Sequence, residues 1–376
     1  NTGRLPTALR QAQLVKIVQE DRVQLRFDST LTREFEPVVD IHIAVISTSL
    51  GPRGATIGLE GCPSDDAHLI TRTLDAQGQA GQLDTYEDLG FLAWDPAQQL
   101  SPPGQSDAAS LGADLEQLVA GVGEKGCGYE AQLESWYRFL VDPDPYESVE
   151  RSGSKTSLVG TDGALLEQRQ AFLRPDSLVA IMLLSDENDC SFRAAGQGFF
   201  TAEADALYPL QARAECAVDP SDPCCTPCGH APEGCSEDPT CNDAPAYHHD
   251  MSNLHCFAQK QRFGADFLYP VERYVHGLTL DVVPDRDGDL VDNPLLATTR
   301  DGVRYVRPKD RVFFAAIVGV PWQDIARVGA GGQPSLEAGL KTAAELAEDD
   351  TWSVILGDPS RGVPPADPHM ICLLYT

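Results

Sequence analysis

The sequence has no apolar run that approaches the roughly eighteen residues of a membrane-spanning helix. It is also poor in basic residues: 28 lysines and arginines stand against 57 aspartates and glutamates, and the net charge is -29 at pH 7. Such a charge repels the phosphates of nucleic acids and anionic lipid surfaces. We therefore expect neither nucleic-acid binding nor a transmembrane segment in this chain.

Motifs of nucleotide binding and of nucleophilic catalysis are also missing. Gly329, Gly331 and Gly332 precede an amphipathic stretch, but without the Lys-Ser/Thr of a phosphate loop or the spacing of a dinucleotide site. The sequence contains no Gly-x-Ser-x-Gly pentapeptide. His42 lies in an apolar stretch, where a histidine is more often a packed core residue than a general base. We therefore expect no catalytic residues, and a protein that is not an enzyme.

Cysteine, by contrast, is abundant. Seven of the eleven cysteines fall between residues 216 and 256, in a segment rich in proline, aspartate and glycine. This density is typical of disulfides formed in an oxidising compartment. Zinc is the alternative, because Cys225-x-x-Cys228 precedes several histidines, but structural zinc sites usually pair two half-sites and the second is missing here. The pattern favours disulfides in an irregular insertion at about 205–252.

Ten cysteines are enough for five bridges, which leaves Cys372 near the end of the sequence without a partner. The ten are Cys62, Cys127, Cys190, Cys216, Cys224, Cys225, Cys228, Cys235, Cys241 and Cys256. Because disulfides persist in oxidising compartments, we expect an exported protein, in the periplasm, on the outer-membrane surface or outside the cell. The first residue is Asn1 rather than Met, so we expect a truncated N-terminus and treat the C-terminus in the same way.

Strongly apolar segments alternate with amphipathic ones along the chain. Strands are predicted at about 41–47, 90–96, 179–185, 312–319 and 352–356. Helices are predicted at 5–20, 111–122, 129–141, 163–173, 253–278 with a kink at Pro270, and 334–350. Residues 142–163 are predicted to be a polar connection. Apolar strands separated by amphipathic helices indicate an α/β fold, with a mostly parallel sheet covered by helices on both faces.

An acidic cluster follows one of these strands. The run "LVAIMLL" ends at Ser185 and is followed by Asp186, Glu187 and, after one asparagine, Asp189. Ligands of open α/β sheets collect at the carboxyl ends of the strands, and carboxylates are the ligands that Mg²⁺ and Ca²⁺ favour. The alternative is that these acids cap the following helix or simply end the strand in solvent.

Several segments, in this order, resemble von Willebrand factor type A-like proteins of myxobacteria and related bacteria. They are "DIHIAVISTSLG", "GCGYEAQLESWYRFLV", "AFLRPDSLVAIMLLSDENDCS", "QKQRFGADFLYPVERYV" and "FFAAIVGVPWQDIA". The resemblance covers most of the chain and implies one Rossmann-like type A domain over 1–376 that contains the cysteine-rich insertion. Those proteins are predicted to be exported, often as lipoproteins, and most have no assigned activity.

The resemblance also implies a cation site at the strand ends, of which the sequence retains a part. Asp186 fits the aspartate that follows a later strand in type A domains. If the first residues continue the loop after a preceding strand, Thr2 stands at a serine position of that loop. Arg4 stands at the next one, where a guanidinium cannot ligate a cation. In the remaining loop, "GCGYE", Glu130 is the nearest oxygen ligand in place of a threonine. The expected site is therefore degenerate.

A second acidic segment, "PDRDGDLVDN", offers another candidate. Asp285, Asp287, Asp289 and Asp292 resemble the alternating ligands of a calcium loop. The spacing departs from an EF-hand, because the glycine precedes the third aspartate and no glutamate stands at the twelfth position. A hairpin turn at Asp287-Gly288 is the alternative.

These expectations favour a non-catalytic binding or adhesion module of the bacterial cell envelope or the extracellular space. Its partner would be an unidentified protein or cell-surface ligand, and Mg²⁺ or Ca²⁺ would be the cofactor. Two alternatives remain: a metal-dependent hydrolase that uses the strand-end carboxylates, and a calcium-stabilised structural envelope protein. A deep pocket with a perturbed carboxylate beside the metal would favour the hydrolase, and a shallow exposed surface would favour adhesion.

Overall fold

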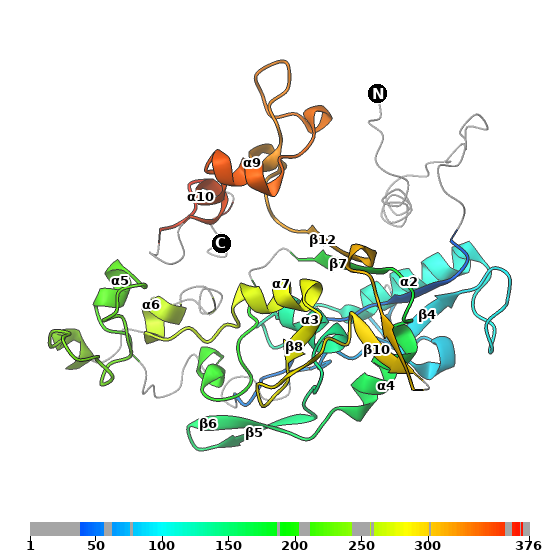
Figure 1. Ribbon diagram of the computed structural model, residues 1–376, viewed down its shortest axis with the longest axis horizontal. Helices are drawn as coiled ribbons and strands as arrows, with labels where there is room; N and C mark the ends of the chain where they lie inside the picture. Colours follow the sequence, from blue (N-terminus) through cyan, green and yellow to red (C-terminus); the bar gives the residue numbers. More distant parts are fainter. Residues whose placement is uncertain are drawn as a thin grey trace. The chain divides into compact units, whose positions relative to one another are not determined.

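A computed structural model describes most of the chain. The described residues are 38–55, 62–75, 78–185, 189–202, 211–242, 256, 259–300, 302–357, 363–368 and 370. The chain divides into two compact units. Figure 1 labels the main helices and strands of both. The first comprises Asn1–Ser47, His68–Glu124 and Gln170–Phe172, and the second comprises Thr48–Ala67, Lys125–Arg169 and Leu173–Thr376. Within the described residues, no helix has both the length and the apolar character of a membrane span.

The first unit combines short antiparallel sheets with one long helix. Its elements are β1 (Ile41–Ala44), β2 (Arg72–Leu74), β3 (Ala80–Gln82), η1 (Tyr86–Asp88), β4 (Phe91–Trp94) and α2 (Ala108–Val122). Helix α2 begins at Asp107, whose side chain accepts a hydrogen bond from the Ser110 amide. At Gly121 the helix lies directly against β2, because a Cβ there would be 1.9 Å from the Arg72 carbonyl oxygen. The predicted strands at 41–47 and 90–96 and the helix at 111–122 are thus present.

His42 packs among the aromatic side chains of this unit. Its ring lies 4.5 Å, centroid to centroid, from Phe91, which is 1% exposed. Its Nδ1 lies 2.9 Å from the carbonyl oxygen of Phe172, whose ring also contacts Phe91. These contacts match the expectation that His42 is packed, and they cover the side of β1 on which His42 lies.

The second unit contains most of the chain. Its first elements are α3 (Gln132–Leu140), β5 (Ser148–Ser152), β6 (Lys155–Val159), α4 (Gly163–Phe172, whose last three residues belong to the first unit), β7 (Val179–Leu184) and η2 (Gly198–Thr201). Then follow α5 (Glu215–Val218), η3 (Pro239–Asn242), α6 (Gln259–Phe263), α7 (Val271–Thr279), β8 (Val282–Pro284) and β9 (Leu290–Asp292). The last are β10 (Ala297–Arg300), β11 (Val303–Val306), η6 (Lys309–Arg311), β12 (Val312–Ile317), α8 (Trp322–Ile325), η7 (Leu336–Ala338), α9 (Ala343–Glu348) and α10 (Thr351–Leu356).

Strands β7 and β12 form the one parallel pair among the described strands. Their register runs from Val312 beside Val179 to Ile317 beside Leu184. The mixed α/β character and the pairing of these two apolar runs are therefore confirmed. The expected mostly parallel sheet with helices on both faces is not found among the described strands, because β7 and β12 pair only with each other and β1 pairs antiparallel with β4 in a separate two-stranded sheet.

The predicted strand at 352–356 is wrong, since these residues form helix α10. A short apolar run does not distinguish a strand from a buried helix turn by itself. At the start of this helix, the Asp349 carboxylate accepts a hydrogen bond of 3.2 Å from the Thr351 amide. The predicted helix at 334–350 begins later than expected, at a capping box in which Thr342 and Glu345 bond each other's backbone amides.

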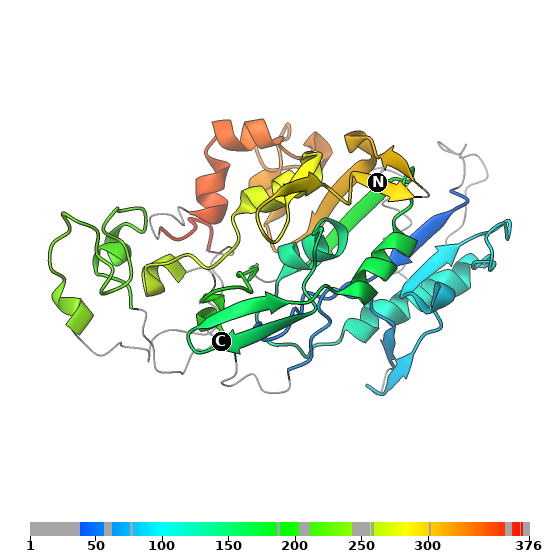
Figure 2. The same ribbon diagram turned by 60° about the horizontal axis from the view of Figure 1, so that its bottom comes forward.

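The polar stretch at 142–163 contains a β-hairpin that the sequence analysis missed. Strands β5 and β6 pair over Ser148–Ser152 and Lys155–Val159, and Figure 2 shows the hairpin as a long green ribbon. Gly153 in the two-residue loop has a φ of 61°, a conformation that glycine adopts without strain. The serine–glycine–serine sequence at 152–154 was the available signal, but the few apolar residues around it hid the hairpin.

The predicted long helix at 253–278 is interrupted. Among its described residues, α6 ends at Phe263 and α7 begins after Pro270, which occupies the N-cap position. The expected kink at Pro270 is thus a full break between two helices. Phe263 and Phe267 enter the main apolar cluster of this unit, together with Tyr129, Cys190, Phe192, Phe199, Phe200 and Cys256.

Candidate functional site

The carboxyl end of β7 lies beside the beginning of α3. Gln132 is 4% exposed, and its Nε2 donates a 2.9 Å hydrogen bond to the Ser185 hydroxyl oxygen. On the far side of the acidic cluster, the Cys190 amide donates a 2.7 Å bond to the Glu130 carbonyl oxygen. The loop that contains Glu130 and the loop after β7 are therefore neighbours. The predicted ligands Asp186, Glu187 and Thr2, and also Arg4, lie outside the described residues.

Asp189 caps helix α3 from this loop. Its Oδ1 accepts hydrogen bonds from the Leu133 amide at 2.9 Å and from the Ser191 hydroxyl at 2.7 Å, and its Oδ2 accepts from the Ser191 amide at 3.1 Å. The Ser191 hydroxyl oxygen in turn accepts a 2.9 Å bond from the Glu134 amide. Burial raises the pKa of Asp189, while these hydrogen bonds oppose the shift. The carboxylate thus caps helix α3, which precedes it in the chain, rather than the following helix that the sequence alternative named.

A buried arginine holds both loops in place. Arg53 is 3% exposed, and its Nη2 lies 3.2 Å from the Tyr129 carbonyl oxygen and 3.3 Å from that of Cys190. Burial lowers the pKa of Arg53, against the attraction of nearby acidic groups such as Asp189. A local sequence pattern carries no signal for this role, because the three carbonyl partners of the guanidinium, those of Tyr129, Cys190 and Phe192, are distant from Arg53 in the chain.

An ion pair between the buried Glu134 and the partly buried Arg273 joins α3 to α7. The Arg273 guanidinium donates to both carboxylate oxygens of Glu134, at 2.9 and 3.1 Å, and the Tyr274 hydroxyl donates to Glu134 at 3.0 Å. Burial opposes the charge of Arg273, but the Glu134 carboxylate raises its pKa. The Arg273 guanidinium also stacks 3.8 Å from the centroid of the Tyr137 ring. This pair fixes the helix on which Gln132 stands.

The second acidic segment forms the hairpin between β8 and β9. The Asp285 carboxylate accepts hydrogen bonds from the amides of Asp287, at 3.0 Å, and Asp289, at 2.9 Å. Asp292 forms an ion pair with Arg304, in which the guanidinium donates two hydrogen bonds to the carboxylate, at 2.8 and 2.9 Å. The hairpin turn is therefore present, and two of the four predicted ligands are engaged in it or in the ion pair. Over the described ranges, no three His, Cys, Asp or Glu side chains are grouped closely enough to hold a metal ion.

The ten predicted cysteines form five disulfides, so the prediction of disulfides is confirmed. Two bridges join distant segments, Cys62–Cys127 and Cys190–Cys256. Three lie within residues 211–242, and each of them overlaps the next along the chain: Cys216–Cys225, Cys224–Cys235 and Cys228–Cys241. The Cys190–Cys256 bridge directly follows Asp189 and thus anchors the strand-end loop.

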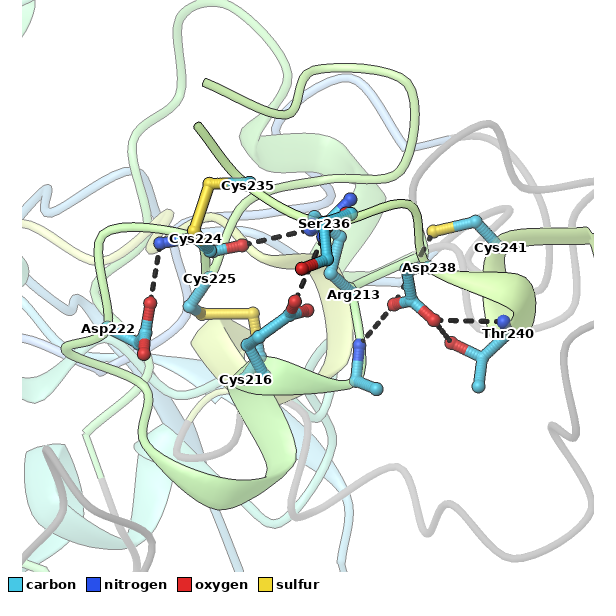
Figure 3. A network of polar contacts seen from close by, with 12 residues as sticks. Arg213, Cys216, Asp222, Cys224, Cys225, Cys235, Ser236, Asp238, Thr240 and Cys241 are labelled. Atoms are coloured by element: carbon cyan, nitrogen blue, oxygen red, sulfur yellow. Dashed lines mark hydrogen bonds and ion pairs between the residues drawn. A yellow bond between two sulfur atoms is a disulfide. The ribbon is translucent and has the colours of Figure 1, made fainter. Parts of the chain in front are cut away.

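Polar contacts fill the disulfide-bonded segment (Figure 3). The Arg213 guanidinium donates to the carbonyl oxygens of Cys224, at 3.1 Å, and Ser236, at 2.6 Å. The Asp238 carboxylate accepts from the Ala214 amide at 2.6 Å and from the Thr240 hydroxyl at 2.7 Å. Buried polar groups need such partners. The segment is therefore ordered by bridges and hydrogen bonds, with little regular secondary structure.

The fold and the site define a mixed α/β protein with five disulfides and a strand-end loop fixed on both sides. No protein-family model, no curated protein and no solved structure matches the chain. We therefore infer the function from the geometry of the chain itself.

Proposed function

We propose that this chain is a non-catalytic binding module, exported to the bacterial cell envelope or beyond it, which binds a protein or another cell-surface ligand through the strand-end loop. One observation carries the proposal. Ser185 is bonded to Gln132, and Asp189 is bonded to Leu133, so both flanks of residues 186–188, which include Asp186 and Glu187, are anchored to α3. Flanking residues that are already held in place lose little conformational entropy when a ligand binds.

The buried carboxylates near this loop support binding rather than catalysis. A general base must offer a free oxygen to the proton that it abstracts. Asp189 accepts three hydrogen bonds in capping α3, and both oxygens of Glu134 accept from Arg273. These two side chains are thus committed to structural contacts, and a role for the site in adhesion agrees with them.

A divalent cation completes the proposed site. Asp186 and Glu187 are the proposed direct ligands of Mg²⁺ or Ca²⁺, with Thr2 as a third oxygen donor. Asp189, whose oxygens already accept amide hydrogens, would orient the loop or contribute through water. The ion would link the module to a carboxylate of its partner.

The proposal also includes a more specific type of fold for the chain. A type A-like, Rossmann-like sheet is supported by the in-register parallel pair of β7 and β12 and by the acidic sequence after β7. Export, by itself or as a lipoprotein, is supported by the five disulfides, because such bridges persist in oxidising compartments.

Titration calorimetry with Mg²⁺ and with Ca²⁺ tests the cation site. We expect one ion to bind to the chain and Asp186→Ala to abolish the binding. Asp287→Ala, which changes the acidic hairpin, is the matched control and should leave it intact. If binding survives Asp186→Ala but is lost in Asp287→Ala, the cation site lies in the hairpin. If neither ion binds to the chain, the proposed cation site is wrong.

A further inference from the structure

One buried oxygen atom beside the strand-end loop has no hydrogen-bond partner among the described residues. It is Oε1 of Gln132, the first residue of α3, which is 4% exposed. Taking such an oxygen out of water is unfavourable unless a donor or a cation contacts it. This atom is therefore a candidate contact for a bound ligand.

The contacts of the same side chain determine which way its amide group is turned. Nε2 of Gln132 donates to the Ser185 hydroxyl oxygen at 2.9 Å and lies 3.5 Å from Oε2 of Glu130. If the amide were reversed, Oε1 would face the Glu130 carboxylate, which would place two acceptors together with no hydrogen between them. The nitrogen therefore faces these two groups, and Oε1 is the atom left for another contact.

Gln132 lies beside the segment to which the proposed cation site is assigned. Ser185, to which it is bonded, is the last described residue before Asp186 and Glu187 in the sequence. Oxygen atoms of carboxylates and of side-chain amides are both ligands of Ca²⁺. The unpartnered amide oxygen is thus an observation, independent of the acidic sequence, that points to a cation.

We propose that Gln132 is a ligand of the cation through Oε1, and that the cation is Ca²⁺. This inference rests on the proposed function and deepens it, because it adds a neutral ligand and chooses between two ions. Mg²⁺ keeps several water molecules in its coordination shell, whereas Ca²⁺ accepts about six to eight oxygen ligands, those of glutamine included. A ligand oxygen on a buried side chain leaves little room for retained water. Burial of Gln132 therefore favours Ca²⁺.

Two disulfides hold the segments on either side of Gln132. The Cys62–Cys127 bridge fixes the loop before α3, and the Cys190–Cys256 bridge fixes the loop after β7. A ligand that is already held in its position loses little conformational entropy when the ion binds. The amide oxygen of Gln132 is therefore preorganised for a cation.

Titration calorimetry of the chain with Ca²⁺ and with Mg²⁺ tests this assignment. We expect Ca²⁺ to bind more tightly than Mg²⁺. Gln132→Met removes the oxygen and should weaken Ca²⁺ binding about tenfold or more, since even residues that only orient metal ligands contribute that much. Gln132→Glu keeps the length of the side chain and supplies a carboxylate, so it should bind Ca²⁺ at least as tightly as the unchanged chain. Gln117→Met, which changes an exposed glutamine of α2, is the matched control and should leave binding unchanged.

Thermal unfolding with a chelator separates ligation from a structural role. Without the ion, Gln132→Met should unfold at about the same temperature as the unchanged chain, but added Ca²⁺ should stabilise this variant less. A lower unfolding temperature of Gln132→Met in chelator, with the same stabilisation by Ca²⁺, would show a structural role and overturn the proposal. If Gln132→Met does not fold, Gln132→Glu decides, because loss of Ca²⁺ binding in a variant that supplies a carboxylate would also overturn it.

The outcomes distinguish this inference from the proposed cation site itself. If Asp186→Ala abolishes Ca²⁺ binding but Gln132→Met leaves it unchanged, the cation site is supported and Gln132 is not a ligand, so that Oε1 contacts only water. If Gln132→Met weakens binding but Asp186→Ala does not, Gln132 is supported as a ligand and the assignment of Asp186 is wrong. Tighter binding of Mg²⁺ than of Ca²⁺, or no binding of either ion, would overturn the proposal of a calcium ligand.

Discussion

The Nη1 atom of Arg53 donates a 3.0 Å hydrogen bond to the carbonyl oxygen of Phe192, and the guanidinium carbon lies 3.5 Å from the centroid of the Phe192 ring. The same side chain bonds the carbonyl oxygens of Tyr129 and Cys190. One buried cation thus fastens the loop before α3 to the loop after β7. Arg53 therefore fixes the positions of the two loops that form the candidate site.

Replacement of Arg53 by methionine should destabilise the fold strongly. The change leaves three carbonyl oxygens without their donor and removes the stacking on Phe192, so the free energy of unfolding should fall by about 3–5 kcal/mol. Denaturant unfolding measures the effect. Arg193→Met is the matched control, because Arg193 is exposed and makes a 3.2 Å bond to the Asp266 carbonyl oxygen at the surface. An equal loss in both variants would contradict the anchoring role of Arg53.

The Glu134–Arg273 pair should behave as one unit. Glu134→Gln or Arg273→Met leaves a buried partner without its counter-charge, and each change should lower the free energy of unfolding by about 3–5 kcal/mol. The double variant should lose clearly less than the sum of the two, because the second change removes a charge that is already unpaired. The exposed pair of Asp292 and Arg304 is the control, and its double-mutant cycle should show little coupling. Additive losses at Glu134 and Arg273 would contradict this prediction.

Glu345 should remain ionised in acid. The hydrogen bonds from Arg327, and those with Thr342, lower the pKa of Glu345 from 4.5 to about 2. Because the folded-state pKa is lowered, the carboxylate stabilises the fold fully above pH 4.5, and this stability is lost as the pH falls to about 2. The carboxyl signal in an NMR titration should therefore have its midpoint near the lower value.

Two variants examine the cause of this shift. Arg327→Met removes the two-bond ion pair with Glu345, at 2.8 and 2.9 Å, and should raise the midpoint. Glu348→Gln changes an exposed residue of the same helix and should leave the midpoint of Glu345 unchanged. A midpoint that stays low in Arg327→Met would assign the shift to Thr342 instead.

The denatured, unreduced chain should contain at most one free thiol. Five bridges use ten of the eleven cysteines, and the remaining one is Cys372. Reaction with a thiol reagent before and after reduction provides the count, and all eleven should react after reduction. Four or more free thiols, together with bound zinc, would show that residues 216–256 form a metal site instead.

Local patterns were sufficient for several features. The apolar runs at 179–184 and 312–317 indicated strands, because continuous apolar residues need cover on both sides. The spacing of Trp136, Tyr137 and Leu140 indicated a helix with a buried face, and all three side chains are buried in α3. The density of cysteine indicated disulfides. Each of these inferences uses information that lies within a few residues.

Other features depend on contacts between distant residues, which no local pattern contains. Composition predicted five bridges but not the pairs, because ten cysteines can be joined in many ways and only the folded chain brings Cys190 to Cys256. The antiparallel partner of β1 and the helical form of 351–356 depend on the surroundings in the same way. Arg53 is not among the residues that the sequence pattern singled out, and its role arises only where three carbonyl oxygens meet around one guanidinium. Burial makes these hydrogen bonds important for the fold, because a polar group that is shielded from water must find its partner within the protein.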